Sequence, residues 1–244
     1  MNIIEEMSRI KNQLKRIEIR LTQNRGATQA LSVTEDAVAF KDNFDDSVKF
    51  WAWREFNTDA ATTITEAGGK LSFHIDNGTD GTLTSGADNG PYSLIGVPSC
   101  SCIIETKCEN FTPAADNSGG ILISRYPGNA AAWNWIGIFR HKSATFDGLM
   151  VYRAGGVLAT QAAWTTDPFW LRICVSGFST YGQNILFQYS SDGLSWTTLW
   201  TETSGSFTYS HGWMAGPFIR NAGVFPVTDM DFDYFKIIPS FGPG

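Results

Sequence analysis

From Phe44 to the end of the chain, short runs of aromatic and β-branched residues alternate with turn signals about every ten residues. Strands favour aromatic and β-branched side chains, and the turns between strands need glycine. The sequence holds 24 Gly, 17 Phe, 9 Trp and 7 Tyr, and no helical pattern separates the runs. These features argue against a parallel α/β sheet. They predict an all-β fold, a two-sheet antiparallel jelly-roll sandwich over residues 44–244.

The stretch 133–141 shows the alternation expected of a strand. Trp133, Trp135 and Phe139 share one face, while Ile136 and Ile138 share the other.

The first 25 residues form a separate unit with a heptad pattern. Apolar residues spaced alternately by four and three positions are Ile3, Met7, Ile10, Leu14, Ile17 and Leu21. Leu at position a with Ile at position d disfavours parallel dimers and favours three or four strands. We therefore expect residues 1–25 to be a coiled-coil oligomerisation helix that forms a homotrimer. The alternative is a helix that packs on its own domain. Residues 26–43 are expected to be a linker, either an extended tether or a strand against a neighbouring subunit.

Several segments of the β region resemble the concanavalin-A-like jelly roll, and its laminin-G-like subtype in particular. The strand 170–173 reads Trp-Leu-Arg-Ile, and the hairpin 189–196 has Asp192-Gly193 at its turn. A closing strand contains 233–235, Asp-Tyr-Phe. The resemblance covers about 44–239. Its motifs serve turns and core, so the resemblance implies the fold and leaves the function open.

A short coiled coil joined to a lectin-like sandwich resembles phage virion proteins. We therefore expect a non-enzymatic homotrimeric tail fibre or tailspike whose sandwich binds host cell-surface glycan. One alternative is a capsid decoration, cement or adaptor protein that binds only neighbouring virion subunits. Another alternative is a glycan hydrolase. The expected location is the virion surface after assembly in the host cytoplasm, because the acidic start of the chain lacks the uncharged core of a secretory signal.

A glycan-binding surface needs exposed aromatic rings for stacking and polar groups for sugar hydroxyls. The expected carbohydrate-binding residues are Trp133, Asn134, Arg140, Trp164, Asp167 and Trp213. For each Trp the alternative is burial in the core.

Catalytic residues are not expected. Glycosidases need two carboxylates about 5–10 Å apart. Glu105 and Glu109 lie on one face of a predicted strand, but four residues of strand separate them by about 13 Å. Asp229, Asp231 and Asp233 alternate along the last strand, and we interpret them as charges that keep an edge strand soluble.

No metal or cofactor is expected either. The segment 76–81 resembles the start of a calcium loop, but Ala87 stands where an EF-hand needs a bidentate Glu. Calcium in a sandwich loop is left open by the resemblance. The four Cys are expected to be free thiols, since no secretory route is visible.

Charge limits the expected partners. The net charge is −6 and the sequence pI is near 5.0, which argues against nucleic acid as a partner. No run is long and apolar enough for membrane insertion. The expected partners are further copies of the chain, other virion proteins and cell-surface glycan.

Overall fold

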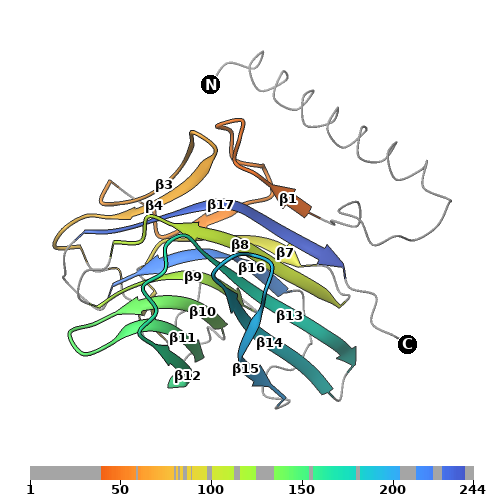
Figure 1. Cartoon of the computed structure of the whole chain (residues 1–244). Coiled ribbons are helices and arrows are strands. Elements are labelled where there is room, and N and C mark those ends of the chain that lie inside the picture. The colour runs from red at the N-terminus through yellow and green to blue at the C-terminus, as the bar shows by residue number, and fades with distance from the viewer. Residues whose placement is uncertain are drawn as a thin grey trace. The chain divides into compact units, whose positions relative to one another are not determined.

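The computed structural model describes residues 40–58, 60–79, 81, 83–84, 87–88, 90–97, 101–112, 116–124, 135–153, 156–179, 182–203, 213–221 and 227–239 (Figure 1). The chain divides into one unit at Met1–Val38 and a second at Ala39–Gly244. The predicted coiled-coil residues, from Ile3 to Leu21, lie outside the described residues. The homotrimer therefore stays a prediction.

The described residues confirm the predicted all-β sandwich of two antiparallel sheets. The order in the eight-stranded sheet is β15 (Thr197–Glu202), β14 (Gly182–Ser190), β13 (Phe169–Ser179), β8 (Cys102–Glu109), β17 (Thr228–Pro239), β4 (Lys70–Ile75) and β3 (Thr62–Ala67), with β1 (Phe40–Asp42) also on β17. The order in the seven-stranded sheet is β12 (Gly156–Ala162), β11 (Asp147–Arg153), β10 (Trp135–Lys142), β9 (Asn117–Ser124), β16 (Trp213–Arg220), β7 (Tyr92–Val97) and β2 (Arg54–Phe56). A small hairpin pairs β5 (Leu83–Thr84) with β6 (Ala87–Asp88). Strand β1 falls within the last residues of the predicted linker.

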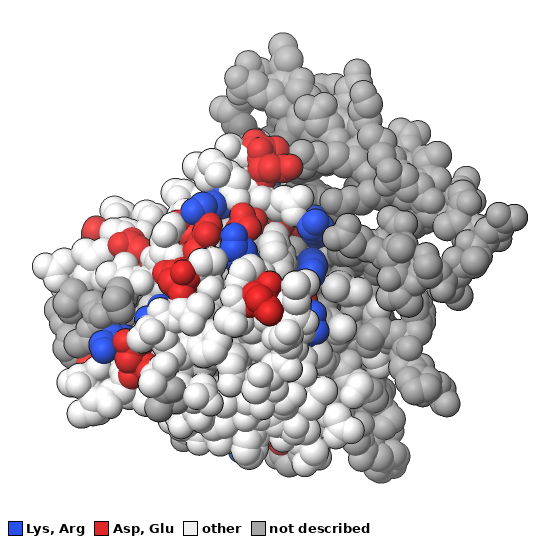
Figure 2. Space-filling view, in the orientation of Figure 1, with Lys and Arg blue, Asp and Glu red and all other residues white. Residues whose placement is uncertain are grey.

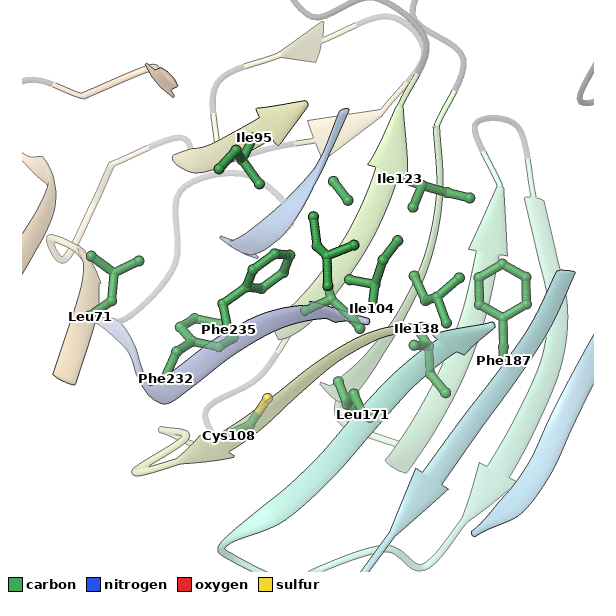
Figure 3. Close-up of a cluster of buried hydrophobic side chains, with 14 of the residues drawn as sticks. Leu71, Ile95, Ile104, Cys108, Ile123, Ile138, Leu171, Phe187, Phe232 and Phe235 are labelled. Carbon is green, nitrogen blue, oxygen red and sulfur yellow. The ribbon is translucent and has the colours of Figure 1, made fainter. Parts of the chain in front are cut away.

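Alternation along the strands builds the core between the sheets. On β8, Cys102, Ile104 and Cys108 are buried in the core, while Glu105 and Lys107 belong to the opposite face. Ile, Leu and Phe side chains from both sheets meet these residues in one cluster (Figure 3). One face of each sheet is thereby removed from water, which is the main stabilising contribution to such a sandwich.

A β-bulge changes the alternation in β17. Its register on β8 shifts between Phe232 and Tyr234. Phe232 and Phe235 are both buried in the core although they are three residues apart. The extra residue therefore leaves both Asp233 and Tyr234 on the face turned away from the core.

The prediction that the three aspartates mark an edge strand is wrong. Strand β17 lies inside the sheet, between β8 and β4. Its carboxylates are instead paired across strands, with Asp229 on His74, Asp231 on Lys70 and Asp233 on Lys107. Charge on this strand is neutralised by neighbours that are remote in sequence.

The central strands of the seven-stranded sheet, β9, β10 and most of β11, are buried on both faces. Ile136 and Ile138 join the core between the sheets, while Trp135 and Phe139 join a second cluster on the other face. We call this second cluster the aromatic face. Its members are Phe56, Tyr92, Leu94, Leu122, Trp135, Phe139, Phe146, Met150, Tyr152, Met214 and Phe218.

No helix among the described residues is long and apolar enough to cross a membrane.

Candidate functional site

The outer face of the eight-stranded sheet carries a continuous set of ionised side chains, which we call the charged face. Strands β4, β17, β8 and β13 lie side by side and contribute Lys70, His74, Glu105, Lys107, Glu109, Arg172, Asp229, Asp231, Asp233 and Lys236. On the side of the molecule seen in Figure 2, acidic and basic side chains are interspersed rather than separated by sign. Carboxylates in such an arrangement have defined partners and positions.

Two carboxylates meet at one ammonium on this face. Glu109 on β8 is the direct cross-strand partner of Asp231 on β17. Lys70 Nζ lies 2.7 Å from Glu109 Oε1 and 3.7 Å from Asp231 Oδ2. Asn110 Nδ2 also donates to Asp231 Oδ2, at 2.6 Å. The two side chains keep 17% and 20% of their surface exposed, so a ligand in solvent can reach them.

The separation of this pair suits glycoside chemistry. Oxygens that both contact Lys70 Nζ can be no further apart than the two contact distances together. That limit is compatible with the separation of about 5–5.5 Å in retaining glycosidases and lies below the 6.5–9.5 Å of inverting ones. The sequence argument missed the pair because it measured carboxylate spacing along a single strand. The approach of Glu109 to Asp231 comes from the pairing of β8 with β17, and nothing local in the sequence signals that pairing.

Glu105 is buried on the same face of β8, four residues before Glu109, and has a different environment. Its carboxylate accepts hydrogen bonds from Arg172 Nη2 at 2.6 Å and Tyr234 Oη at 2.7 Å, and Lys236 Nζ lies 2.6 Å away. Burial acts to raise the pKa of Glu105, but the hydrogen bonds from Lys236, Arg172 and Tyr234 outweigh it and lower that pKa. With its oxygens enclosed by donors, Glu105 organises the neighbouring side chains.

Aromatic rings border the charged face on its β13 side. The Arg172 guanidinium lies 3.6 Å from the centre of the Trp196 ring, and Lys107 Nζ lies 5.9 Å from that of Trp170. Trp196 follows the predicted Asp192-Gly193 hairpin turn. In that turn Asp192 Oδ1 accepts hydrogen bonds from the backbone N–H groups of residues 194 and 195, each at 2.8 Å. These bonds lower the pKa of Asp192 to about 2. The turn thereby fixes the approach of Trp196 to the sheet.

The structure does not bring the described members of the expected glycan-binding set into one exposed patch. Trp213 is 2% exposed in the core, and Arg140 is 4% exposed and packs over Phe111. Trp164 is half-buried, with its ring centre 4.9 Å from that of Tyr189. Asp167 is exposed and accepts a hydrogen bond from the Asn110 backbone N–H.

Trp133 and Asn134 lie outside the described residues. A carbohydrate role for the expected set stays a prediction. Because Trp213 is buried, neither face of its ring is open to a sugar. For this Trp the structure shows the alternative of burial in the core.

Within the described ranges, no group of three or more His, Cys, Asp and Glu side chains is placed to hold a metal ion. Cys102, Cys108 and Cys174 are free thiols, and Cys100 lies outside the described residues.

Comparison with known proteins gives matches in structure only. No family model matches the chain, and no curated protein does. A variant of the GH43 protein BlXynB from Bacillus licheniformis matches with a TM-score of 0.66 and 18% identity, over 87% of this chain and 41% of that one. Xylan beta-1,4-xylosidase from Bacillus halodurans C-125 matches with a TM-score of 0.56 and 13% identity, over 81% and 38%. LamA from Zobellia galactanivorans, in complex with laminaritriose and laminaritetraose, matches with a TM-score of 0.56 and 11% identity, over 83% and 99%.

At these identities the likeness shows the fold, a jelly-roll-like sandwich of two antiparallel sheets. The chain spans about two fifths of the length of the first two proteins and nearly all of LamA.

The same comparisons contradict the expectation of a non-enzymatic virion structural protein. The similar structures are mostly glycoside hydrolases, so they favour the alternative of a glycan hydrolase over the virion interpretation and over the absence of enzymatic function. The virion interpretation combined the heptad pattern of residues 1–25 with a lectin-like resemblance whose motifs serve turns and core, and neither carries information about the chemistry of the sandwich.

Proposed function

We propose that the sandwich hydrolyses glycans with Glu109 and Asp231 as its two carboxyl groups. The observation that carries this proposal is their cross-strand pairing at Lys70 Nζ, on an accessible face of a sheet. The likeness to glycoside hydrolases supports it at the level of the fold. Trp170 lies on β13 and Trp196 in the loop between β14 and β15, where exposed parts of their rings can stack on sugar units.

The short separation of the pair assigns a retaining mechanism. One carboxylate attacks the anomeric carbon while the other carboxyl group gives its proton to the leaving oxygen. The resulting glycosyl ester is then cleaved by water, which the second group activates by taking back a proton. Lys70 contacts both groups and so holds them in position for the two steps.

The test is release of reducing ends by the full chain from xylan and from laminaritetraose, which are named with two of the similar structures. Glu109→Gln and Asp231→Asn should each lower turnover by about 10²–10⁴-fold. Asp229→Asn is the matched control, because it removes a carboxylate from the same strand and face that pairs with His74 rather than with Lys70. Each variant is first shown by thermal unfolding to be folded.

Proton NMR of the first product on a hydrolysed substrate distinguishes the two mechanisms. Retention of anomeric configuration is expected from the carboxylate separation. Turnover that survives both Glu109→Gln and Asp231→Asn, or no release of reducing ends from any of a wide panel of glycans, would overturn the assignment.

A further inference from the structure

An apolar patch is exposed where the chain enters the sandwich, in the segment 48–51. Val48 and Trp51 are 46% and 61% exposed. The ring centre of Trp51 lies 5.6 Å from that of the half-buried Phe50. The ring centre of Phe50 in turn lies 5.4 Å from that of Phe40 on β1. We call Val48, Phe50 and Trp51 the entry patch.

Packing inside the sandwich does not explain the place of Trp51. The backbone N–H of Trp53 donates to the Phe50 carbonyl at 3.0 Å, so Trp51 lies at the tip of a turn, where small and polar residues are favoured. Exposed large apolar residues are few among the described residues, namely Val48, Trp51, Val157 and Leu194. Single exposed apolar residues are ordinary, but neighbouring ones indicate a contact surface.

Charged residues of both signs lie in the same segment. Lys49 Nζ pairs with Glu55 Oε1 at 2.5 Å, and Asp45 and Arg54 are exposed. A polar rim around an apolar centre is the arrangement of protein–protein interfaces, in which Trp is among the residues that contribute most to binding. Because the segment carries both acids and bases, a second copy of the same surface is not repelled by it.

The chain that precedes the patch indicates what covers it. Residues 26–39 connect Phe40 to the heptad segment, whose apolar positions favour the association of three or four copies. A connector of this length reaches at most about 50 Å when fully extended. Sandwiches joined by associated stalks are therefore present to each other at an effective concentration in the millimolar range. The surface beside Phe40 is the part of each sandwich that the shortest connection brings to its neighbours.

We propose that the entry patch is the contact between the sandwiches of neighbouring copies of this chain. The Trp51 ring of one copy packs on the apolar side chains of the same segment in the next copy. Three residues fall far short of the roughly 20–30 residues that a stable interface uses on each side, so the patch associates only when the stalks hold the copies together. The proposal rests on the expected association of residues 1–25 and is independent of the proposed hydrolysis.

The first experiment is hydroxyl-radical footprinting of the full chain, read by mass spectrometry. Leu14→Asp places a charge in the heptad seam and supplies a chain whose stalk does not associate. Oxidation of Trp51 should be several-fold slower in the wild type than in Leu14→Asp, because the ring is covered only in the assembly. Leu194, which is 85% exposed in the loop between β14 and β15, should react equally in both.

Analytical ultracentrifugation then measures how much the patch contributes to association. Trp51→Ser should raise the dissociation constant of the full chain by at least about 10-fold, because truncation of a central interface Trp is costly. Leu194→Ser is the matched control, since it removes another exposed apolar side chain, and it should leave the dissociation constant unchanged. Thermal unfolding shows whether each variant is folded. If Trp51→Ser does not fold, the footprint of the wild type against Leu14→Asp decides.

Three results would overturn the proposal. A full chain that sediments as a monomer at every concentration leaves the patch without a second copy to bind. Equal oxidation of Trp51 in the wild type and in Leu14→Asp places any contact between copies elsewhere. Protection of Trp51 that appears only after xylan or laminaritetraose is added would make the ring a sugar-binding surface instead.

Discussion

The inner faces of the two sheets are both apolar, but their outer faces differ in chemistry. The charged face joins acidic and basic side chains across β4, β17, β8 and β13. The aromatic face packs rings against each other, with the ring centres of Phe56 and Tyr92 4.7 Å apart and those of Trp135 and Phe218 5.8 Å apart. The cation on that face, Arg220, lies 5.1 Å from the ring centres of both Phe139 and Tyr152.

This difference separates two sources of stability. Buried rings contribute through lost hydration and close packing, which depend on the volume of each side chain. Half-exposed ion pairs contribute little, because water and salt screen them and both side chains lose freedom. Substitutions on the aromatic face should therefore lower stability strongly. Substitutions on the charged face should lower it little, so that face can hold catalytic groups.

The largest effect is expected on the aromatic face, at Phe139. Truncation by Phe139→Ala removes a fully buried ring and should lower the free energy of unfolding by about 3–5 kcal/mol. Phe139→Leu keeps much of the volume and should cost less. Urea denaturation measures both, and a loss below about 1 kcal/mol for Phe139→Ala would show that the face can collapse around the gap.

Glu105 should give the next largest effect, as the buried exception on the charged face. Glu105→Gln removes the negative charge and one of the two acceptor oxygens and places an NH2 group among the donors of Arg172, Lys236 and Tyr234, so it should cost about 2–3 kcal/mol at neutral pH. Because the folded-state pKa is lowered, this stabilisation is present above about pH 4.5 and is lost as the pH falls through the lowered value. Acid denaturation curves of the wild type and variant should converge at low pH. Parallel curves would contradict the assigned role.

Lys107 should show how little an exposed pair contributes. Lys107→Ala removes the 2.9 Å pair with Asp233 and the 3.6 Å contact with Glu109; the Lys107 and Asp233 side chains are 22% and 39% exposed, so the loss should be less than about 1 kcal/mol. The same urea series measures it. A loss as large as that of Phe139→Ala would remove the proposed distinction between the faces.

The smallest effect is expected at His74, and it depends on pH. Hydrogen bonds to Asp229 and then to Asp76 raise the pKa of His74. Its stabilisation is therefore fully present below about pH 6.5 and is lost as the pH rises through the raised value. His74→Gln should be less stable than the wild type at pH 5.5 and equal to it at high pH. A constant difference from pH 5.5 to 9 would show that the charge on the ring is not involved.

The sequence predicted the layers of this fold better than the neighbours of each strand. The periodicity of 133–141 put Ile136 and Trp135 on opposite faces of a strand, as the structure has them, because alternation is a local property of the backbone. The Asp192-Gly193 turn was equally local, and the structure contains it. Turn chemistry and side-chain period thus fix strands and hairpins before any long-range contact forms.

The candidate site was not predictable in the same way. Asp231 would be solvated on an edge strand, but it faces Glu109 because β8 lies beside β17. These two residues are more than 100 positions apart in the sequence. The same holds for Lys70, which reaches both carboxylates from β4. The number of Trp residues in the sequence likewise does not tell which of them are buried, as Trp213 is. A single sequence contains these side chains but not their pairing.

The pairing of β1 with β17 has a consequence for how the sandwich can be joined to other proteins. Phe40 lies opposite Ile237, so the chain enters the sandwich beside the place where it leaves. The sandwich is therefore suited to circular permutation, with a short loop joining Phe40 to the end of β17 and new termini at a surface turn such as the one after Ser190. The sandwich could also be inserted into a loop of a host protein without spreading that loop. Force applied through both ends would open β1 from β17 one hydrogen bond at a time, since the two strands would peel from the same end.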